Sequence, residues 1–191
     1  MGKPLSEMTL RELWELFPIQ LVEHRECWDR WYREERTALL VFLPGPIQIH
    51  HIGSTAVSGI WAKPIIDILL EAPSSDHQKI RDLLTGHGYI CMSESRTRTD
   101  FNKGYTPSGF AERVFHLHLR EVGDHDELYF RDYLNDHPDI AKAYERLKLS
   151  LWKPYEHDRD GYTEQETEFV KEYTQKAIQS YGRAKRWDDD I

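Results

Sequence analysis

The sequence predicts an α+β domain in which a mixed β-sheet is covered by packed helices. Two β-branched runs, residues 47–52 and 65–70, are typical of strands, and residues 113–122 form a third alternating run. Helical periodicity precedes these strands between residues 9 and 43 and follows them between residues 126 and 181. An order of helices, then strands with one helical crossover, then helices indicates the α+β class.

The N-terminal part is predicted to contain two helices. Thr9 and Glu12 have the spacing of a capping box, which opens a short helix that Pro18 ends. Residues 19–43 are expected to form one long helix with a solvated charged face. Proline and glycine at positions 44–46 end this helix before the first strand.

The remaining elements follow from the same patterns. Residues 76–84 read as a helix and 89–95 as a strand, and residues 104–112 as a loop that leads into the third strand. Asp126 is a plausible N-cap for the helical part that follows. The predicted C-terminal elements are helices over 127–135, 139–155 and 162–181, the last opened by a capping box of Thr163 and Glu166, and then a disordered tail over 182–191.

Composition limits the kind of protein. A length of 191 residues suits one domain, and a formal net charge of −8 argues against a surface that grips extended nucleic acid. The two cysteines, Cys27 and Cys91, have neither metal-type spacing nor a disulfide pattern. With no signal-peptide pattern and no long apolar run, we expect a cytoplasmic protein that does not enter a membrane. The oligomeric state is left open.

The segment between the first two strands contains a corner suited to phosphate. Gly53, Ser54 and Thr55 follow the first strand, and glycine allows backbone N–H groups to turn towards an anion. Lys63 comes just before the second strand and can pair with a phosphate or with Asp67. Asp67 is a lone carboxylate among isoleucines and leucines, where an acid is costly unless a cation or donor meets it.

A second acid next to Asp67 is missing. Side chains at i and i+2 share a strand face, but the i+2 position is Leu69. Glu71 is four residues away, about 13 Å along a strand. The strand therefore lacks the acid pair of a two-metal site, and a structural alternative is that Asp67 bonds to nearby backbone or to Lys63.

His116 and His118 lie on one face of the third strand and can reach one metal ion or one phosphate. With Asp67 they predict a divalent metal site for Mg, Mn or Zn, of which the softer metals suit imidazole better. The alternative is a pair of hydrogen-bonded core histidines. His51 either neighbours this site or is a solvated or core histidine.

These residues resemble the GrpB family, also called UPF0157. The resemblance extends from about residue 47 to 177, and its most specific part is the pair of motifs GSTAV and KPIID. The matching residues are His51-Ile52-Gly53-Ser54-Thr55-Ala56-Val57, Gly59, Ala62-Lys63-Pro64-Ile65-Ile66-Asp67, Lys103-Gly104, Arg113, His116-Leu117-His118-Leu119, Phe130-Arg131-Asp132-Tyr133-Leu134, His137-Pro138, Asp158-Arg159 and Tyr162-Thr163.

The resemblance implies a single GrpB-like domain with a nucleotidyltransferase-like fold. It adds Lys103 and Arg113 as candidate phosphate contacts, although strand alternation places Arg113 on the face opposite His116. One position departs from the family pattern, because Glu166 stands where relatives usually have lysine in the motif YT-x-x-K. An acid there reverses the local charge and argues against a triphosphate contact from this helix.

Three functions follow from these observations. The first is metal-assisted transfer of a nucleotidyl group from a nucleoside triphosphate to a small acceptor, with Asp67 and His118 as catalytic residues. In it, Gly53, Ser54 and Thr55 hold phosphates with Lys63 or Lys103. The second is a nucleotide- or phosphate-binding module without catalysis, which Leu69 and Glu166 both favour. The third is metal-dependent hydrolysis by the His and Asp cluster.

Overall fold

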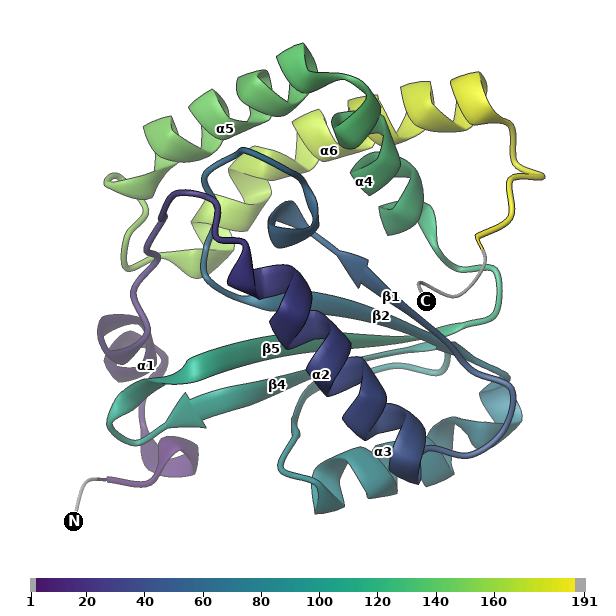
Figure 1. Ribbon diagram of the computed structural model, residues 1–191. Coiled ribbons are helices and arrows are strands. Elements are labelled where there is room, and N and C mark those ends of the chain that lie inside the picture. The colour runs from purple at the N-terminus through teal and green to yellow at the C-terminus, as the bar shows by residue number, and fades with distance from the viewer. Residues whose placement is uncertain (1–2, 188–191) are drawn as a thin grey trace.

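The computed structural model describes residues 3–187, in which one mixed sheet carries helices on both of its faces (Figure 1). This confirms the predicted α+β class and the mixed sheet with packed helices that the nucleotidyltransferase-like resemblance implied. The sheet order is β1-β2-β5-β4-β3. The strands are β1 (Gln48–Ile52), β2 (Ile66–Ala72), β3 (Ile90–Glu94), β4 (Arg98–Thr106) and β5 (Gly109–Glu121).

The central pair of strands, β2 and β5, is parallel, and the other three pairs are antiparallel. A parallel pair requires a crossover, which here contains α3 (His77–Gly86) and the strands β3 and β4. The register sets residue 67 opposite residue 116 and residue 69 opposite residue 118. Asp67, His116 and His118 therefore face the same side of the sheet.

One face of the sheet is covered by α2 (Cys27–Phe42) and α3, which bury the main core. The buried residues of α2 recur at helical spacing, so a single apolar stripe of this helix meets the strands. They are Trp28, Trp31, Tyr32 and Leu39. From the sheet, the alternate positions Ile66, Ile68, Leu70, Phe115, Leu117 and Leu119 point into the same cluster.

The other face carries α4 (Asp126–Asp136), α5 (Pro138–Trp152) and α6 (Arg159–Tyr181), which lie together beside β1 and β2 (Figure 1). Pro138 occupies the first turn of α5, where its missing N–H needs no partner. The prediction that Thr163 caps the last helix is wrong. The helix begins at Arg159, and the Asp158 side chain accepts a hydrogen bond from Gly161 N at 2.9 Å.

The N-terminal prediction is confirmed for the short helix and wrong for the long one. The capping box of Thr9 and Glu12 opens α1 (Leu10–Leu16). The chain then runs without helix until Cys27, because its backbone groups find partners far along the sequence. Ile19 N donates to Glu156 O at 2.8 Å, and Val22 forms a β-bridge with Ala62.

Smaller differences concern turns and the C-terminus. The predicted loop over residues 104–112 is the hairpin of β4 and β5, with the register shifted near Lys103. His125, not Asp126, is the N-cap of α4. Of the predicted tail, residues 188–191 lie outside the described residues, whereas Lys185 and Trp187 both contact Asp132 of α4. Short 3₁₀ turns complete the structure at η1 (Leu5–Glu7), η2 (Ser54–Ala56) and η3 (Ser74–Asp76).

Among residues 3–187, no helix is long and apolar enough to span a membrane.

Candidate active site

Asp67 and the two histidines of β5 converge on one face of the sheet. Asp67 Oδ1 lies 3.3 Å from His116 Nδ1 and 3.6 Å from His118 Nε2. The expectation that the histidine strand neighbours the Asp67 strand is therefore confirmed. Burial raises the pKa of Asp67, but hydrogen bonds from the two imidazoles outweigh it and hold the pKa of this carboxyl well below its ordinary value. Asp67 is an anion at any physiological pH.

His118 is held between two carboxylates. Its Nδ1 lies 2.8 Å from Asp100 Oδ1 of β4, and Arg120 Nη2 donates to the same oxygen at 2.8 Å. Burial lowers the pKa of His118, but its bonds to Asp100 and Asp67 outweigh burial and raise the pKa to about 9. His118 therefore carries a positive charge at neutral pH, and it compensates the Asp67 carboxylate from the neighbouring strand.

His116 is held by a chain of hydrogen bonds that begins at α6. Arg159 Nη1 donates to the Tyr105 hydroxyl at 2.8 Å, and that hydroxyl lies 2.8 Å from His116 Nε2. Burial lowers the pKa of His116, so the ring is neutral at pH 7. Because Arg159 only donates, we assign the phenol hydrogen to the bond with Nε2, which leaves the ring proton on Nδ1 facing Asp67.

His51 does not join the predicted metal site of Asp67, His116 and His118. His51 lies opposite Ile68 in the register, on the face that α2 covers, where its ring stacks on Tyr32 and its Nε2 lies 2.9 Å from Thr55 Oγ1. The next residue, Ile52, is the one paired with Asp67, and side chains alternate along a strand. The His51 side chain therefore points to the face opposite Asp67. In the described part of the chain, no group of three or more His, Cys, Asp or Glu side chains is arranged to hold a metal ion.

A small cavity of about 130 Å³, the lysine pocket, opens beside Asp67. Lys63 reaches it from the segment before β2, and Lys148 reaches it from α5, where its side chain is only 1% exposed. The lining residues are Gly53, Ser54, Thr55, Lys63, Ile65, Asp67, His116, Tyr144, Lys148 and Glu166. The structure thus confirms that the Gly-Ser corner, Lys63 and Asp67 lie together.

Charges in the lysine pocket are strongly perturbed by burial. Burial lowers the pKa of Lys63, and it lowers that of Lys148 to about 7. Burial also raises the pKa of Glu166, whose Oε1 accepts a hydrogen bond from the Tyr144 hydroxyl at 3.0 Å. Glu166 is therefore a member of the site and not the capping partner of Thr163. Such clustering of shifted groups in a cavity is typical of functional sites.

Gly53 allows the corner to approach Asp67. Its backbone has φ 73° and ψ −173°, a conformation open to glycine and strained for other residues. A Cβ at this position would overlap Oδ2 of Asp67. The glycine thus places the η2 turn, with Ser54, directly against the carboxylate. Thr55 is less available, because its hydroxyl donates to Ile65 O at 3.3 Å.

A larger groove of about 640 Å³ continues from the lysine pocket between α6, α4 and the sheet. Gly53, Ser54, Asp67 and Tyr144 line both spaces, so the carboxylate stands where the two meet. His118 also lines the groove. The arrangement can hold a charged group in the small space and an organic part in the large one.

Two predicted phosphate contacts lie elsewhere. Lys103 Nζ is bonded to Glu35 Oε1 at 2.5 Å, and Arg113 is paired with Glu34, both on α2. Their side chains therefore lie on the face opposite the lysine pocket. For Arg113 this agrees with the strand alternation, and for Lys103 the register opposite Phe115 has the same consequence. Neither residue belongs to the candidate site.

Several site residues were not predicted. Tyr144 and Lys148 are four residues apart on α5, and the spacing alone places them on one helix face. A lysine on an otherwise apolar face is a signal that could have been used. Asp100 and Tyr105 offer no such signal, because only the pairing of β4 with β5 brings them to the histidines. Arg159 belongs to a motif of the family resemblance, but only the start of α6 and its hydrogen bond to Tyr105 connect it to His116.

The family match covers most of the chain. A family model described as GrpB protein matches residues 18–176. UPF0157 protein PA4798 of Pseudomonas aeruginosa is 39% identical over 168 residues, which are 84% of this chain and 68% of that protein. UPF0157 protein YqkA of Bacillus subtilis is 33% identical over 186 residues, which are 93% of this chain, and the chain spans about half (51%) of that protein.

The fold is also that of a solved relative. The crystal structure of the conserved protein GrpB from Enterococcus faecalis superimposes with a TM-score of 0.74 and 28% sequence identity, over 85% of this chain and 99% of that chain. The lysine pocket and the cluster of Asp67, His116 and His118 lie within the matched residues 18–176, and so do the Gly-Ser corner and the HLH strand that first indicated the resemblance. The chain belongs to the GrpB family.

Proposed function

We propose that this protein is a nucleotidyltransferase-like enzyme that binds a nucleoside triphosphate and transfers its nucleotidyl group to a small acceptor. The observation that carries the proposal is the lysine pocket, in which a Gly-Ser corner and two buried lysines meet Asp67. Buried cations and turn N–H groups are suited to phosphate oxygens. The adjoining groove provides space of about 640 Å³ for a nucleoside or an acceptor.

In this proposal the β- and γ-phosphates bind in the lysine pocket, against Ser54, Lys63 and Lys148. An acceptor hydroxyl forms a new bond to the α-phosphorus, the bond between the α-phosphorus and the bridging oxygen breaks, and pyrophosphate leaves with the electron pair. The acceptor proton passes to water in the groove. His118, as a cation, keeps Asp67 ionised throughout.

A divalent cation enters this proposal with the nucleotide. The protein donors by themselves do not form a metal centre, but Mg²⁺ is commonly held by one or two carboxylates together with substrate phosphates. Asp67 is the carboxylate placed to contact it, and the ion supplies neutralisation of phosphate charge. Nothing in the proposal requires His116 or His118 as metal ligands.

A second candidate is a phosphate-binding module without catalysis. The observation that favours it is Leu69, which is fully buried at the position of the second acid. The third sequence-based alternative, a hydrolase with its own His and Asp metal centre, is not carried forward. The ring nitrogens of both histidines already face hydrogen-bonding partners.

The test is thermal unfolding of the protein with each nucleoside triphosphate, with and without Mg²⁺, Mn²⁺ or Zn²⁺. A ligand at a hundred times its Kd stabilises the folded state by about 2.7 kcal/mol, which is visible as a raised midpoint. The shift should require a metal ion and disappear in Asp67→Asn. It should persist in Asp29→Asn, a matched change on the exposed surface of α2.

Release of pyrophosphate separates the two candidates. An enzyme releases it when a competent acceptor is present, and Asp67→Asn abolishes the release. A module binds the nucleotide and leaves it intact with every acceptor tried. If no nucleotide shifts the midpoint with any metal, both candidates are wrong and the Gly-Ser corner is only a structural turn.

A further inference from the structure

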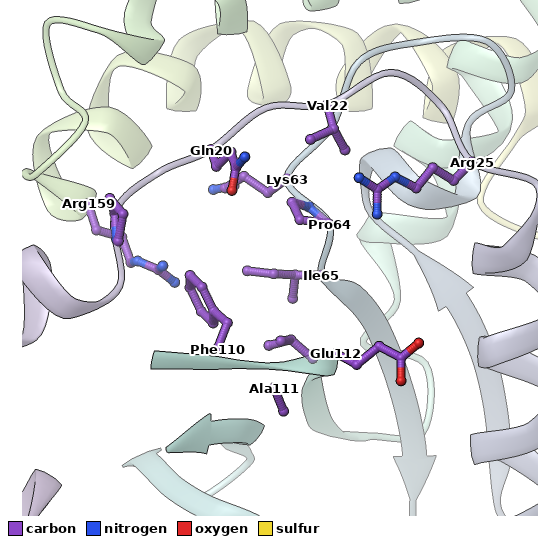
Figure 2. Close-up of a pocket in the computed structure, with 12 residues that line it drawn as sticks. Gln20, Val22, Arg25, Lys63, Pro64, Ile65, Phe110, Ala111, Glu112 and Arg159 are labelled. Atoms are coloured by element: carbon purple, nitrogen blue, oxygen red, sulfur yellow. The ribbon is translucent and has the colours of Figure 1, made fainter. Parts of the chain in front are cut away.

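A second polar cavity, of about 210 Å³, lies on another side of Lys63 (Figure 2). It is formed by the non-helical segment after α1, the start of β2, the hairpin side of β5 and the start of α6. We call it the arginine pocket. Its lining residues are Pro18, Gln20, Val22, Arg25, Lys63, Pro64, Ile65, Phe110, Ala111, Glu112, Val114 and Arg159.

Three cationic side chains reach this pocket against one acidic side chain. Figure 2 shows the guanidinium groups of Arg25 and Arg159 entering it from opposite ends, with Lys63 and Gln20 between them. The carboxylate of Glu112 points away from the middle of the pocket. The pocket is therefore locally basic in a chain whose formal net charge is −8.

These cations form no direct ion pair with an acid of the described chain, although Glu166 and Asp67 lie near enough to Lys63 to favour its charge. Among residues 3–187, no carboxylate lies within 4.0 Å of the charged groups of Arg25, Arg159 or Lys63. Most other arginines and lysines of the chain do pair with acids, as Arg120 does with Asp100. Guanidinium groups without an acidic partner are stabilised by an oxyanion that accepts their hydrogen bonds.

Arg159 is positioned before any ligand arrives. One of its terminal nitrogens donates to Tyr105 at 2.8 Å, and the other lies 3.5 Å from Phe17 O. A guanidinium carries five N–H donors, so these contacts fix its plane and leave donors for an anion. Fixing the side chain in advance lowers the entropic cost of binding. Gln20 adds an exposed amide that can also donate.

We propose that the arginine pocket binds a small molecule through a phosphate or carboxylate group. Its volume equals that of about seven waters in the liquid, at roughly 30 Å³ each, which suits a small anion and not a nucleotide. Lys63 and Ile65 line both the arginine pocket and the lysine pocket, so the two sites are neighbours. The proposal does not depend on nucleotidyl transfer.

The experiment is a titration of the full chain, at constant ionic strength, with inorganic phosphate, pyrophosphate and succinate. Calorimetry gives the affinity, and two-dimensional NMR of backbone amides gives the location. We expect amides in residues 18–25 and 110–114 to shift with at least one probe. Phosphate probes and succinate distinguish a phosphate from a carboxylate as the recognised group.

Variants decide which pocket is responsible. Arg25→Gln changes an exposed residue and should weaken the affinity about tenfold, since one charge-assisted hydrogen bond is lost. Arg33→Gln, a change of an exposed arginine on α2 outside the pocket, is the control and should have no effect. Glu112→Gln removes the one acid of the pocket and should strengthen binding. Ser54→Ala, which changes the lysine pocket and the groove but no residue of the arginine pocket, should leave these shifts unchanged.

Two results would overturn the proposal. The first is the absence of shifts in residues 18–25 and 110–114 with every probe at millimolar concentration. The second is an affinity unchanged by Arg25→Gln and Glu112→Gln but lost in Ser54→Ala, which assigns the anion to the lysine pocket alone. That second result would support the proposed nucleotide site, so the two proposals can fail separately.

Discussion

Leu69 of β2 lies directly opposite His118 of β5, and the side chain of Leu69 is fully buried. The leucine packs with Ile52 and Leu128, while His118 turns its ring towards Asp67 and Asp100. The position at which a second acid would complete a metal pair is therefore occupied by a core side chain. The protonated His118 on the neighbouring strand compensates the charge of Asp67. In a pair of acids, a metal ion would have that role.

The substitution Leu69→Asp should destabilise the protein and not create a metal site. An aspartate there loses the packing of a buried leucine and buries a carboxylate, and we expect a loss of about 3–5 kcal/mol in the free energy of unfolding. Urea unfolding measures this loss, with Leu69→Met as a control that keeps volume and costs less than about 1.5 kcal/mol. Stability close to the parent's together with tight Mn²⁺ binding would contradict the prediction.

Lys148 should make stability depend on pH. Its folded pKa is lowered to about 7, whereas an unfolded lysine titrates near its ordinary 10.5. Between these values the unfolded state binds more protons than the folded state, so the free energy of unfolding rises with pH, by at most about 1.4 kcal/mol per unit. The measurement is the free energy of unfolding of the parent and of Lys148→Met between pH 6 and 10, about the range of the pKa shift. The same slope in both proteins would assign the effect to other groups.

The Lys148 shift also predicts how anion binding in the lysine pocket varies with pH. A bound phosphate favours the charged amine, so binding is coupled to proton uptake near pH 7 and weakens as pH rises above that value. Calorimetry of nucleotide binding in two buffers with different ionisation enthalpies detects this uptake. Lys148→Met should abolish the uptake. An affinity that is constant from neutral to alkaline pH would show that Lys148 does not meet the anion.

Tyr105→Phe should release His116 from its assigned tautomer. The variant removes the hydroxyl between Arg159 and His116 Nε2 and leaves both without that partner, at a cost of about 1–2 kcal/mol in stability. Nitrogen chemical shifts of the His116 ring should show the proton on Nδ1 in the parent. In the variant they should show a neutral ring whose single proton exchanges between the two nitrogens. Tyr89→Phe is the matched control, because it removes a hydroxyl bond to Glu35 on the opposite face. Unchanged ring shifts in Tyr105→Phe would refute the assignment.

Lys103→Gln and Arg113→Gln should leave nucleotide binding intact. Both side chains pair with acids of α2 on the far side of the sheet, and each partly exposed pair contributes less than about 1 kcal/mol. The midpoint shift induced by a nucleoside triphosphate should therefore equal the parent's, in contrast to Ser54→Ala. A shift lost in either lysine or arginine variant would restore these residues to the site.

The sequence alone determined the features that depend on neighbours along the chain. The alternation in β2 and β5 gave the faces of Asp67, His116 and His118, because side chains alternate in any strand. The capping box of Thr9 and Glu12 gave the start of α1 for the same local reason. The sequence also placed Lys63 next to the Asp67 strand, whereas the pairing of β1 with β2, which sets Ile52 opposite Asp67, brings the Gly-Ser corner to the carboxylate.

Only the tertiary structure decided the partners of those residues. Asp100, Tyr105 and Lys148 meet the site because β4, β5 and α5 bring together positions more than ten residues apart, and no local pattern encodes such distances. The same strand pairing excludes Lys103 from the site. Its position in the register and its ion pair with an acid of α2 hold its side chain on the other face of the sheet. The local sequence indicated which residue types could form the site, whereas burial and long-range packing determine which of those side chains are charged.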